Sequence, residues 1–162
     1  GYRLALPTLS IRIQYRQPIN KIYGRRRNER RSIVPKFGKR SKRRLATCDN
    51  GLQNLFYEVV THFDCSILVG HRGEEDQNKA FDEGKSKVRY PKGKHNSNPS
   101  TAVDVSPYPI DWKDRERFIY FAGFVKGVAL EMGIPLRWGG DWNNDTQLSD
   151  NNFDDLVHFE LQ

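Results

Sequence analysis

Apolar residues recur at steps of three and four in two stretches of the chain, and each stretch predicts a helix with one buried face. The first follows Asp49 or Asn50, either of which can serve as N-cap, and its apolar positions are Leu52, Leu55, Phe56, Val59, Val60 and Phe63. The second begins with Asp111 as N-cap and Asp114 in its first turn, ends at Gly133, and buries Phe118, Phe121, Ala122, Val125, Val128, Ala129 and Met132. A more polar helix is expected over residues 74–83, with Gly84 as its stop.

Short runs with strand character alternate with these helices, at residues 65–70, 102–105, 134–138 and 156–161. Residues 85–100 are rich in Lys, Pro, Asn, Ser and Gly, and residues 141–155 are polar, so both are expected to be loops. The chain leaves little room for the crossovers that parallel strands need. It therefore predicts an α+β domain in which helices flank a small antiparallel sheet.

Charge divides the chain into two unequal parts. Residues 1–45 carry 15 Lys and Arg against one acid, Glu29, whereas residues 46–162 carry 12 Lys and Arg against 19 Asp and Glu. The local net charges of +14 and −7 sum to the +7 of the whole chain. Residues 1–35 also show no sustained apolar period, and three prolines interrupt them. We expect a basic, disordered extension over residues 1–35 and one folded domain over residues 36–162.

The basic runs Arg25–Arg27, Arg30-Arg31 and Lys42–Arg44 stand among few apolar residues, which is typical of solvated, disordered segments. Specific recognition of nucleic acid is not expected, because it needs positive charge on a folded face whose side chains reach the bases. The runs could still dock on an anionic polymer, either nucleic acid or an acidic cell wall.

The two cysteines, Cys48 and Cys65, bracket the first predicted helix and lack the spacing of a zinc knuckle or a redox motif, so we expect buried free thiols. No apolar run approaches the ~20 residues of a membrane span. Residues 4–13 are too short for a span and form a poor signal peptide. We therefore expect synthesis in the cytoplasm without a signal peptide.

Two histidines stand near carboxylates and short apolar runs, and they suggest a metal site. His95, Asp104 and His158 would give a zinc ion three protein ligands and leave a fourth position for water, as catalytic zinc requires. Their separations of nine and fifty-four residues match no zinc finger. Spacing alone leaves an ordinary alternative open, in which His95 is a surface loop residue and His158 a partly buried strand residue.

A zinc-bound water needs a nearby carboxylate as general base, and two acids flank the last histidine. Asp155 stands three residues before His158. Glu160 stands two residues after it and shares its face of the predicted strand. The spacing does not decide between these two acids.

Arg72 is a further candidate for the site because it follows a predicted strand directly. A guanidinium in that position could hold a substrate carbonyl or carboxylate and stabilise an oxyanion. The same residue could instead form a surface ion pair with Glu74 or Glu75, and the sequence pattern leaves both readings open.

Taken in chain order, the segments Gly70–Arg72, His95 with Ala102–Asp104, and Asp155–Leu161 resemble the M15 family of zinc peptidases. This family contains D-Ala-D-Ala carboxypeptidases and dipeptidases as well as phage endolysins. Within it, the sequence is most similar to the phage L-alanyl-D-glutamate endopeptidases, which share a segment like Lys36–Lys39 and a turn like Arg137–Trp142. The resemblance covers residues 36–162.

This resemblance implies a hedgehog-like, D-Ala-D-Ala-peptidase-like fold in which an antiparallel sheet cradles one zinc ion. It implies that His95, Asp104 and His158 are the zinc ligands. It also assigns the general base to Asp155, deciding against Glu160, and gives Arg72 the role of a clamp on the substrate and the transition state.

Two departures from the family pattern lie near the first ligand. The loop between His95 and Asp104 is two residues longer than in many members, with Pro99-Ser100 in place of a small turn. Gly93 stands where those members have a serine that contacts the substrate.

Residues 141–155 begin like a calcium loop but lack the glycine at position six, where Thr146 stands, and the glutamate at position twelve, where Asn152 stands. An EF-hand is therefore not expected. Some phage relatives have a regulatory calcium loop in this region, so a weak Ca²⁺ site is a further expectation. Trp138 and Trp142 either wall a substrate cleft or pack in the core.

We therefore predict a monomeric zinc endopeptidase of bacteriophage lysis that cleaves the stem peptide of peptidoglycan at the L-Ala–D-Glu bond. Such an enzyme would wait in the host cytoplasm for a partner such as a holin and then act on the cell wall. One alternative is a D-Ala-D-Ala carboxypeptidase or dipeptidase of the same family. A second is a non-catalytic, zinc-containing protein that binds an anionic polymer through its basic arm.

Overall fold

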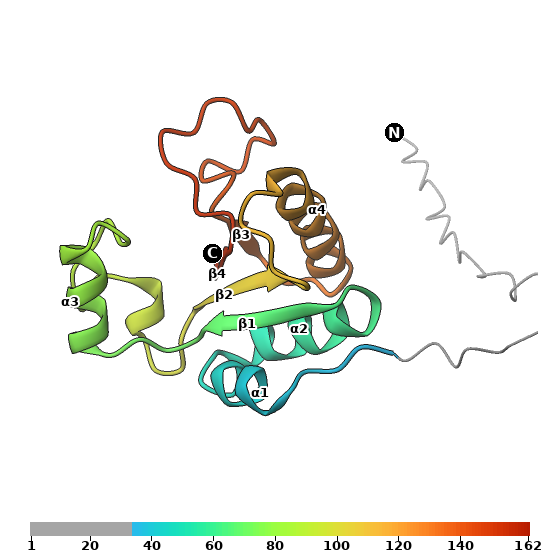
Figure 1. Ribbon diagram of the computed structural model, residues 1–162, viewed down its shortest axis with the longest axis horizontal. Coiled ribbons are helices and arrows are strands. Elements are labelled where there is room, and N and C mark those ends of the chain that lie inside the picture. Colours follow the sequence, from blue (N-terminus) through green and yellow to red (C-terminus); the bar gives the residue numbers. More distant parts are fainter. Residues whose placement is uncertain (1–33) are drawn as a thin grey trace, which may run out of the picture. The chain divides into compact units, whose positions relative to one another are not determined.

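A computed structural model describes residues 34–162 and shows an α+β domain, as the sequence predicts (Figure 1). Its helices are α1 (Lys39–Leu45), α2 (Asn50–His62), α3 (Glu74–Asp82), the short 3-10 helix η1 (Lys94–Asn96) and α4 (Arg115–Glu131). Its strands are β1 (Cys65–Val69), β2 (Ala102–Pro107), β3 (Leu136–Trp138) and β4 (His158–Leu161). The predicted basic extension lies almost wholly outside the described residues.

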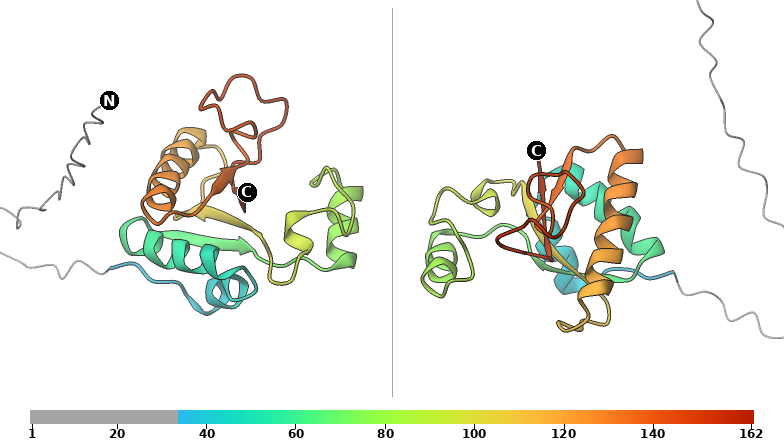
Figure 2. Two further views of the ribbon diagram at one scale, coloured as in Figure 1. Left: turned by 180° about the vertical axis from the view of Figure 1, so that it is seen from behind. Right: turned by 90° about the horizontal axis from the view of Figure 1, so that it is seen from above.

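The strands form one sheet in the order β1-β2-β4-β3, and every neighbouring pair is antiparallel. The predicted antiparallel sheet is thus confirmed. In Figures 1 and 2, α2 and α4 lie side by side against the sheet, whereas α3 and η1 lie together beyond the end of β1. Within residues 34–162, no helix has the length and apolar character needed to cross a lipid bilayer.

Side chains alternate across the two central strands, so one face of the sheet builds the core and the other carries polar residues. Val103 of β2 and Phe159 of β4 are fully buried in the core. The Phe159 ring meets Phe56 of α2 edge-on, with ring centroids 5.5 Å apart. Asp104 and His158, which are paired in the β2–β4 register, project from the opposite face.

The two long helices begin where their capping residues allow. Asp49, one of the two predicted candidates, caps α2, and its side chain accepts a hydrogen bond from the Gly51 amide at 2.8 Å. The N-cap of α4 is Asp114 instead of the predicted Asp111, and it accepts from Arg117 N. Asp111 closes a turn of its own by accepting from Lys113 N, so the helix starts three residues later.

Helix α1 was not predicted, because five of its seven residues are cations and hide its apolar positions. Leu45 at its end and Phe37 just before it are both buried in the core. Lys42–Arg44 therefore belong to an ordered helix, and the expectation that this run is disordered is wrong, although Lys42 and Arg43 are exposed to solvent, as expected.

Cys48 and Cys65 are buried free thiols, as predicted. Burial raises the pKa of Cys48 to about 11 and that of Cys65 to about 12. Because the thiolate is the reactive form, neither cysteine should react with Ellman's reagent at neutral pH in the folded protein, and both should react in guanidinium chloride. Rapid labelling of either thiol before unfolding would contradict this packing.

Candidate metal centre and cleft

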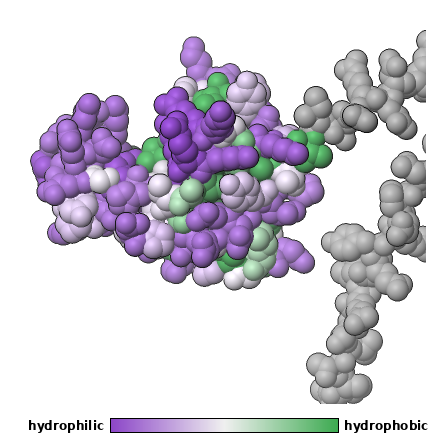
Figure 3. Space-filling model, turned by 90° about the horizontal axis from the view of Figure 1, so that it is seen from below, coloured by the Kyte–Doolittle hydropathy of each residue, from purple (hydrophilic) through white to green (hydrophobic). Residues whose placement is uncertain are grey.

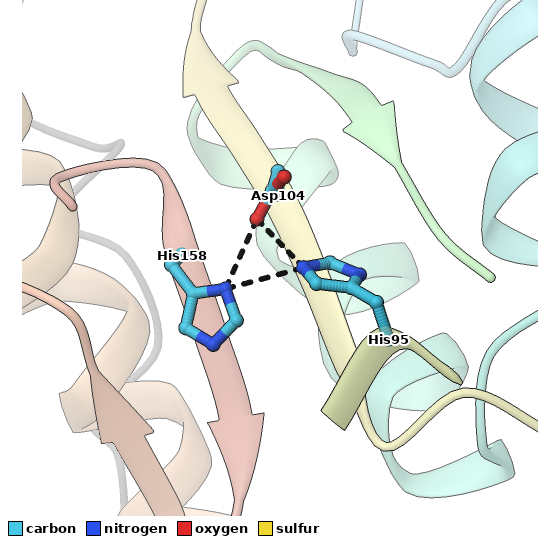
Figure 4. Close-up of side chains that lie close together, drawn as sticks. All are labelled: His95, Asp104 and His158. Atoms are coloured by element: carbon cyan, nitrogen blue, oxygen red, sulfur yellow. Dashed lines mark hydrogen bonds and ion pairs between the residues drawn. The ribbon is translucent and has the colours of Figure 1, made fainter. Parts of the chain in front are cut away.

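Three side chains from separate elements meet on the polar face of the sheet, as Figure 4 shows. Asp104 comes from the middle of β2, His158 begins β4, and His95 reaches them from η1. Asp104 and His158 are brought together by direct pairing in the β2–β4 register. All three side chains are buried. The structure thus brings together the residues that the sequence indicated as metal ligands, and His95 is not a surface loop residue.

The atoms that face one another are His95 Nε2, Asp104 Oδ1 and His158 Nδ1. His95 Nε2 lies 3.0 Å from Asp104 Oδ1 and 3.2 Å from His158 Nδ1, and the remaining side of the triangle is 3.1 Å. Tetrahedral ligands at the ~2.0–2.1 Å distances of zinc are about 3.3 Å apart. The triangle therefore fits a zinc ion with one position left for another ligand. Among residues 34–162, no other group of His, Cys, Asp and Glu converges in this way.

The outer nitrogen of each histidine has a hydrogen-bond partner that selects the ligating tautomer. His95 Nδ1 lies 2.7 Å from the carbonyl oxygen of Gly70, which can only accept, so this nitrogen carries the proton. His158 Nε2 lies 3.0 Å from Glu160 Oε2 in the same way. In the neutral rings, both inner nitrogens then point lone pairs toward Asp104. Three lone-pair atoms this close together repel one another, so the arrangement is stable only around a cation or a shared proton.

The charges at the centre also favour a cation. Burial raises the pKa of Asp104, but the two neighbouring histidines more than offset this and hold it well below its usual range. Burial lowers the pKa of His158, whereas hydrogen bonds to Asp104 and Glu160 raise it to about 9. Two ionised carboxylates therefore surround this histidine, and a bound metal ion would compensate them.

The two acids that flank His158 have different surroundings. Both carboxylate oxygens of Glu160 are occupied, one by His158 and the other by Arg137 Nε at 2.8 Å. Burial raises the pKa of Glu160, but these hydrogen bonds lower it to about 2. Asp155 lines the cleft, and its carboxylate has no hydrogen-bond partner among the described residues. Burial and the charge of Asp104 raise the pKa of Asp155.

Arg72 follows β1 and points toward the same centre. Its Nη2 donates to Asp104 Oδ2 at 3.4 Å, and its Nη1 donates to Gln77 Oε1 at 3.3 Å. The surface ion pair with Glu74 or Glu75, which the sequence left open, is not formed.

Two buried amides that the sequence analysis did not single out hold Arg72 in place. Gln77 of α3 is only 1% exposed and spans the gap between Arg72 and the carbonyl of Val88, to which it donates at 2.6 Å. Asn96 of η1 donates to the Arg72 carbonyl at 2.9 Å. A single inward-facing amide in a polar helix leaves no periodic signal, so the sequence could not reveal these roles.

The centre opens into a cleft of about 810 Å³. Its aromatic walls are Trp112, Trp142 and Phe153. Trp142 stacks on Phe153 and lies 5.5 Å from the ring of His158, measured between centroids. Trp138 is buried in the core instead. The sequence left open whether Trp138 and Trp142 line a cleft or pack in the core, and the structure places Trp142 in the cleft and Trp138 in the core. Trp112 had given no signal in the sequence, because a single exposed aromatic residue has no period.

The departure at Gly93 has a local explanation in η1. The Gly93 amide donates to Asn96 Oδ1 at 2.8 Å. A Cβ atom at position 93 would lie 2.8 Å from that same oxygen, so a serine could not replace this glycine without moving Asn96. Gly93 therefore helps to hold Asn96, which in turn donates to the Arg72 carbonyl.

In the loop between β3 and β4, Asp141 is committed to interactions within the protein. Its carboxylate accepts from Lys126 Nζ at 3.1 Å and from the backbone amides of Asp145 and Thr146. Asn143 donates to the carboxylates of Asp145 and Asp150. The weak Ca²⁺ site within residues 141–155 stays a prediction.

Comparison with known sequences adds to this geometry. Residues 33–162 match the sequence model of the phage L-alanyl-D-glutamate peptidase family. The chain belongs to this family. The matched range spans every residue of the candidate site, and the match makes the protein a member of a peptidase family.

Two relatives illustrate the membership. The chain is 34% identical to the L-alanyl-D-glutamate peptidase of Escherichia phage T5 over 114 residues, which span 67% of this chain and 82% of that protein. The fold is similar to that of the L-Ala D-Glu endopeptidase ChiX from Serratia marcescens, with a TM-score of 0.64 and 24% identity. That similarity covers 78% of this chain and 89% of the solved one, and it supports the fold.

Metal content should depend on the three converging side chains and on no other histidine. We expect His95→Ala, Asp104→Ala and His158→Ala each to abolish tight zinc binding, because each removes one of only three protein ligands. His62→Ala and His71→Ala are matched controls and should keep about one zinc ion per chain. Elemental analysis after dialysis measures this, and circular dichroism checks folding. Full zinc content in a folded Asp104→Ala protein would contradict the site.

Proposed function

We propose that this protein is a zinc-dependent peptidoglycan endopeptidase that cleaves the stem peptide between L-Ala and D-Glu. The observation that carries the proposal is the buried triangle of His95, Asp104 and His158 in a chain of the phage L-alanyl-D-glutamate peptidase family. The names of the family and of the phage T5 relative support the choice of bond. We further propose that residues 36–162 are the catalytic domain and that the cell wall is its site of action.

A zinc ion held by the triangle would act as a Lewis acid on the scissile carbonyl, and it would lower the pKa of a water molecule bound to it to about 7. Asp155 accepts the proton of the attacking water and returns it to the amine of D-Glu as the peptide bond breaks. Its free carboxylate and raised pKa suit both transfers. Arg72 donates to the oxygen on which negative charge develops, and Gln77 keeps its guanidinium in place.

The charge of the cleft suits an acidic peptide. Among the described residues, the cations that line it are Arg72, Lys85, Lys87, Lys92, Lys94 and Arg137, whereas its acids, Asp104, Asp155 and Glu160, gather at the centre. D-Glu in the stem peptide is linked through its side-chain carboxyl, so its α-carboxylate stays free beside the scissile nitrogen. A cationic rim favours binding of such a group and steers it toward the centre.

The roles of the two flanking acids can be separated by isosteric substitution. Asp155→Asn should keep its zinc and lose about 10²–10⁴-fold in kcat, because it removes the proton acceptor. The measurement is turnover of a defined muropeptide together with metal content. A near-normal rate in Asp155→Asn would remove this residue from the mechanism.

Glu160→Gln is the matched control, because it also neutralises an acid beside His158. It should weaken zinc affinity about 10–100-fold by loosening the orientation of His158. Its rate should recover at saturating zinc, which the rate of Asp155→Asn should not. Equal behaviour of the two variants would contradict the division of roles.

The bond itself is tested on purified peptidoglycan with the zinc-loaded protein and with Asp155→Asn, using mass spectrometry of the fragments. We expect new D-Glu amino termini with the unmodified protein only. Release of free D-Ala would instead assign the carboxypeptidase or dipeptidase activity of the wider family. No cleavage by a zinc-loaded protein would favour a non-catalytic binder.

A further inference from the structure

A second, smaller pocket lies outside the cleft, and three arginines are among the residues that line it. Its volume is about 260 Å³, and its walls are Arg40, Arg43, Arg44, Thr47, Gly70 and His71. No acid lines it. Arg44 is half-buried and anchored, because its Nη1 donates to the Ile67 carbonyl at 3.0 Å. Arg40 and Arg43 are exposed and have no hydrogen-bond or ion-pair partner within residues 34–162.

The positive charges on and beside α1 are not neutralised by acidic side chains of the described residues. Lys36, Lys39 and Lys42 stand on and just before the same helix, and none of them pairs with an acid in the described part of the chain. Burial lowers the pKa of Arg44, and the charges of Arg40 and Arg43 lower it further. Repulsion of this kind is unfavourable for the isolated protein, and a bound anion would relieve it.

We propose that Arg40, Arg43 and Arg44 form a binding site for a phosphate group carried by an anionic polymer of the bacterial cell wall. A carboxylate is satisfied by the two parallel donors of one guanidinium. Three arginines around one small pocket can bring donors from several directions to the oxygens of a tetrahedral phosphate. The preference for arginine over lysine inside the pocket agrees with this chemistry, since the helix places its lysines, Lys39 and Lys42, outside it.

The choice of a cell-wall polymer rests on the proposed function and on the position of the pocket. Gly70 and His71 line it, and the next residue, Arg72, lines the cleft. His71 N donates to Thr47 Oγ1 at 2.8 Å on the pocket side, while the Gly70 carbonyl holds His95 on the other. A phosphate polymer attached to the substrate could therefore bind in the arginine pocket while the peptide occupies the cleft. Figure 3 shows the molecule from below Figure 1, the side on which α1 lies, and hydrophilic residues cover much of that surface.

Binding is tested by titrating the full-length, isotope-labelled chain with inorganic phosphate at constant ionic strength. We expect saturable NMR shifts of the Thr47, Gly70 and His71 amides. The double variant Arg40→Gln, Arg43→Gln should lose about tenfold or more in affinity, the size of one or two charge-assisted hydrogen bonds. The double variant Lys39→Gln, Lys42→Gln makes the same change in net charge on the same helix and should lose less than about twofold. No saturable shift, or equal losses in both variants, would overturn the site.

Polymers identify the source of the phosphate. A glycerol phosphate oligomer should bind more tightly than poly-glutamate of equal charge, and Arg40→Gln, Arg43→Gln should abolish the difference. Equal binding of poly-glutamate would overturn the preference for phosphate. Tighter binding of a DNA oligonucleotide than of the glycerol phosphate oligomer would overturn the cell-wall source. These outcomes are independent of peptide cleavage, because neither Arg40 nor Arg43 lines the cleft and a short muropeptide carries no phosphate.

Discussion

The register between β2 and β4 is the constraint on which the rest of the site depends. It pairs Asp104 with His158 on the polar face and sends Val103 and Phe159 into the core on the other. Strand side chains alternate, so a slip of β4 by one residue would turn His158 toward the core and Phe159 away from it, while Asp104 and Val103 of β2 would keep their places. Burial of Phe159 against α2 and α4 therefore also keeps His158 beside Asp104, since it makes a one-residue slip unfavourable.

The position of His95, the third proposed ligand, depends on a different contact. His95 lies outside the sheet, and the carbonyl of Gly70 at the end of β1 orients its ring. Gly70 can take this position because it has no side chain: a Cβ atom there would lie 2.2 Å from the Arg44 carbonyl oxygen. The packing of the basic helix α1 onto β1 thus fixes the backbone that orients a ligand. Helix α1 is consequently part of the framework of the site, in spite of its charge.

Much of this arrangement could be predicted from the sequence, for physical reasons that differ between its parts. The long helices and the strands follow from apolar periodicity, and alternation along β4 placed His158 and Glu160 on one face. The convergence of His95 on Asp104 and His158 depends on tertiary contacts that no local pattern encodes. The residue types suggested a metal site, but their spacing left an ordinary alternative open, and the resemblance to a peptidase family decided between the two. Helix α1 was missed because its cations mask its apolar face. Gln77 escaped notice because one buried amide has no period.

The two acids beside His158 show how one residue type acquires two properties from its surroundings. Glu160 receives hydrogen bonds from His158 and Arg137 on its two carboxylate oxygens, and these bonds stabilise the ionised form. Its carboxylate is therefore a poor proton acceptor. Asp155 is half-buried, faces the negative charge of Asp104, and has no such donors among the described residues, so its carboxylate gains more by accepting a proton. Spacing alone made both acids equal candidates. Their hydrogen-bond partners distinguish Glu160, which is held by His158 and Arg137, from Asp155, whose carboxylate has the free lone pairs that a proton acceptor needs.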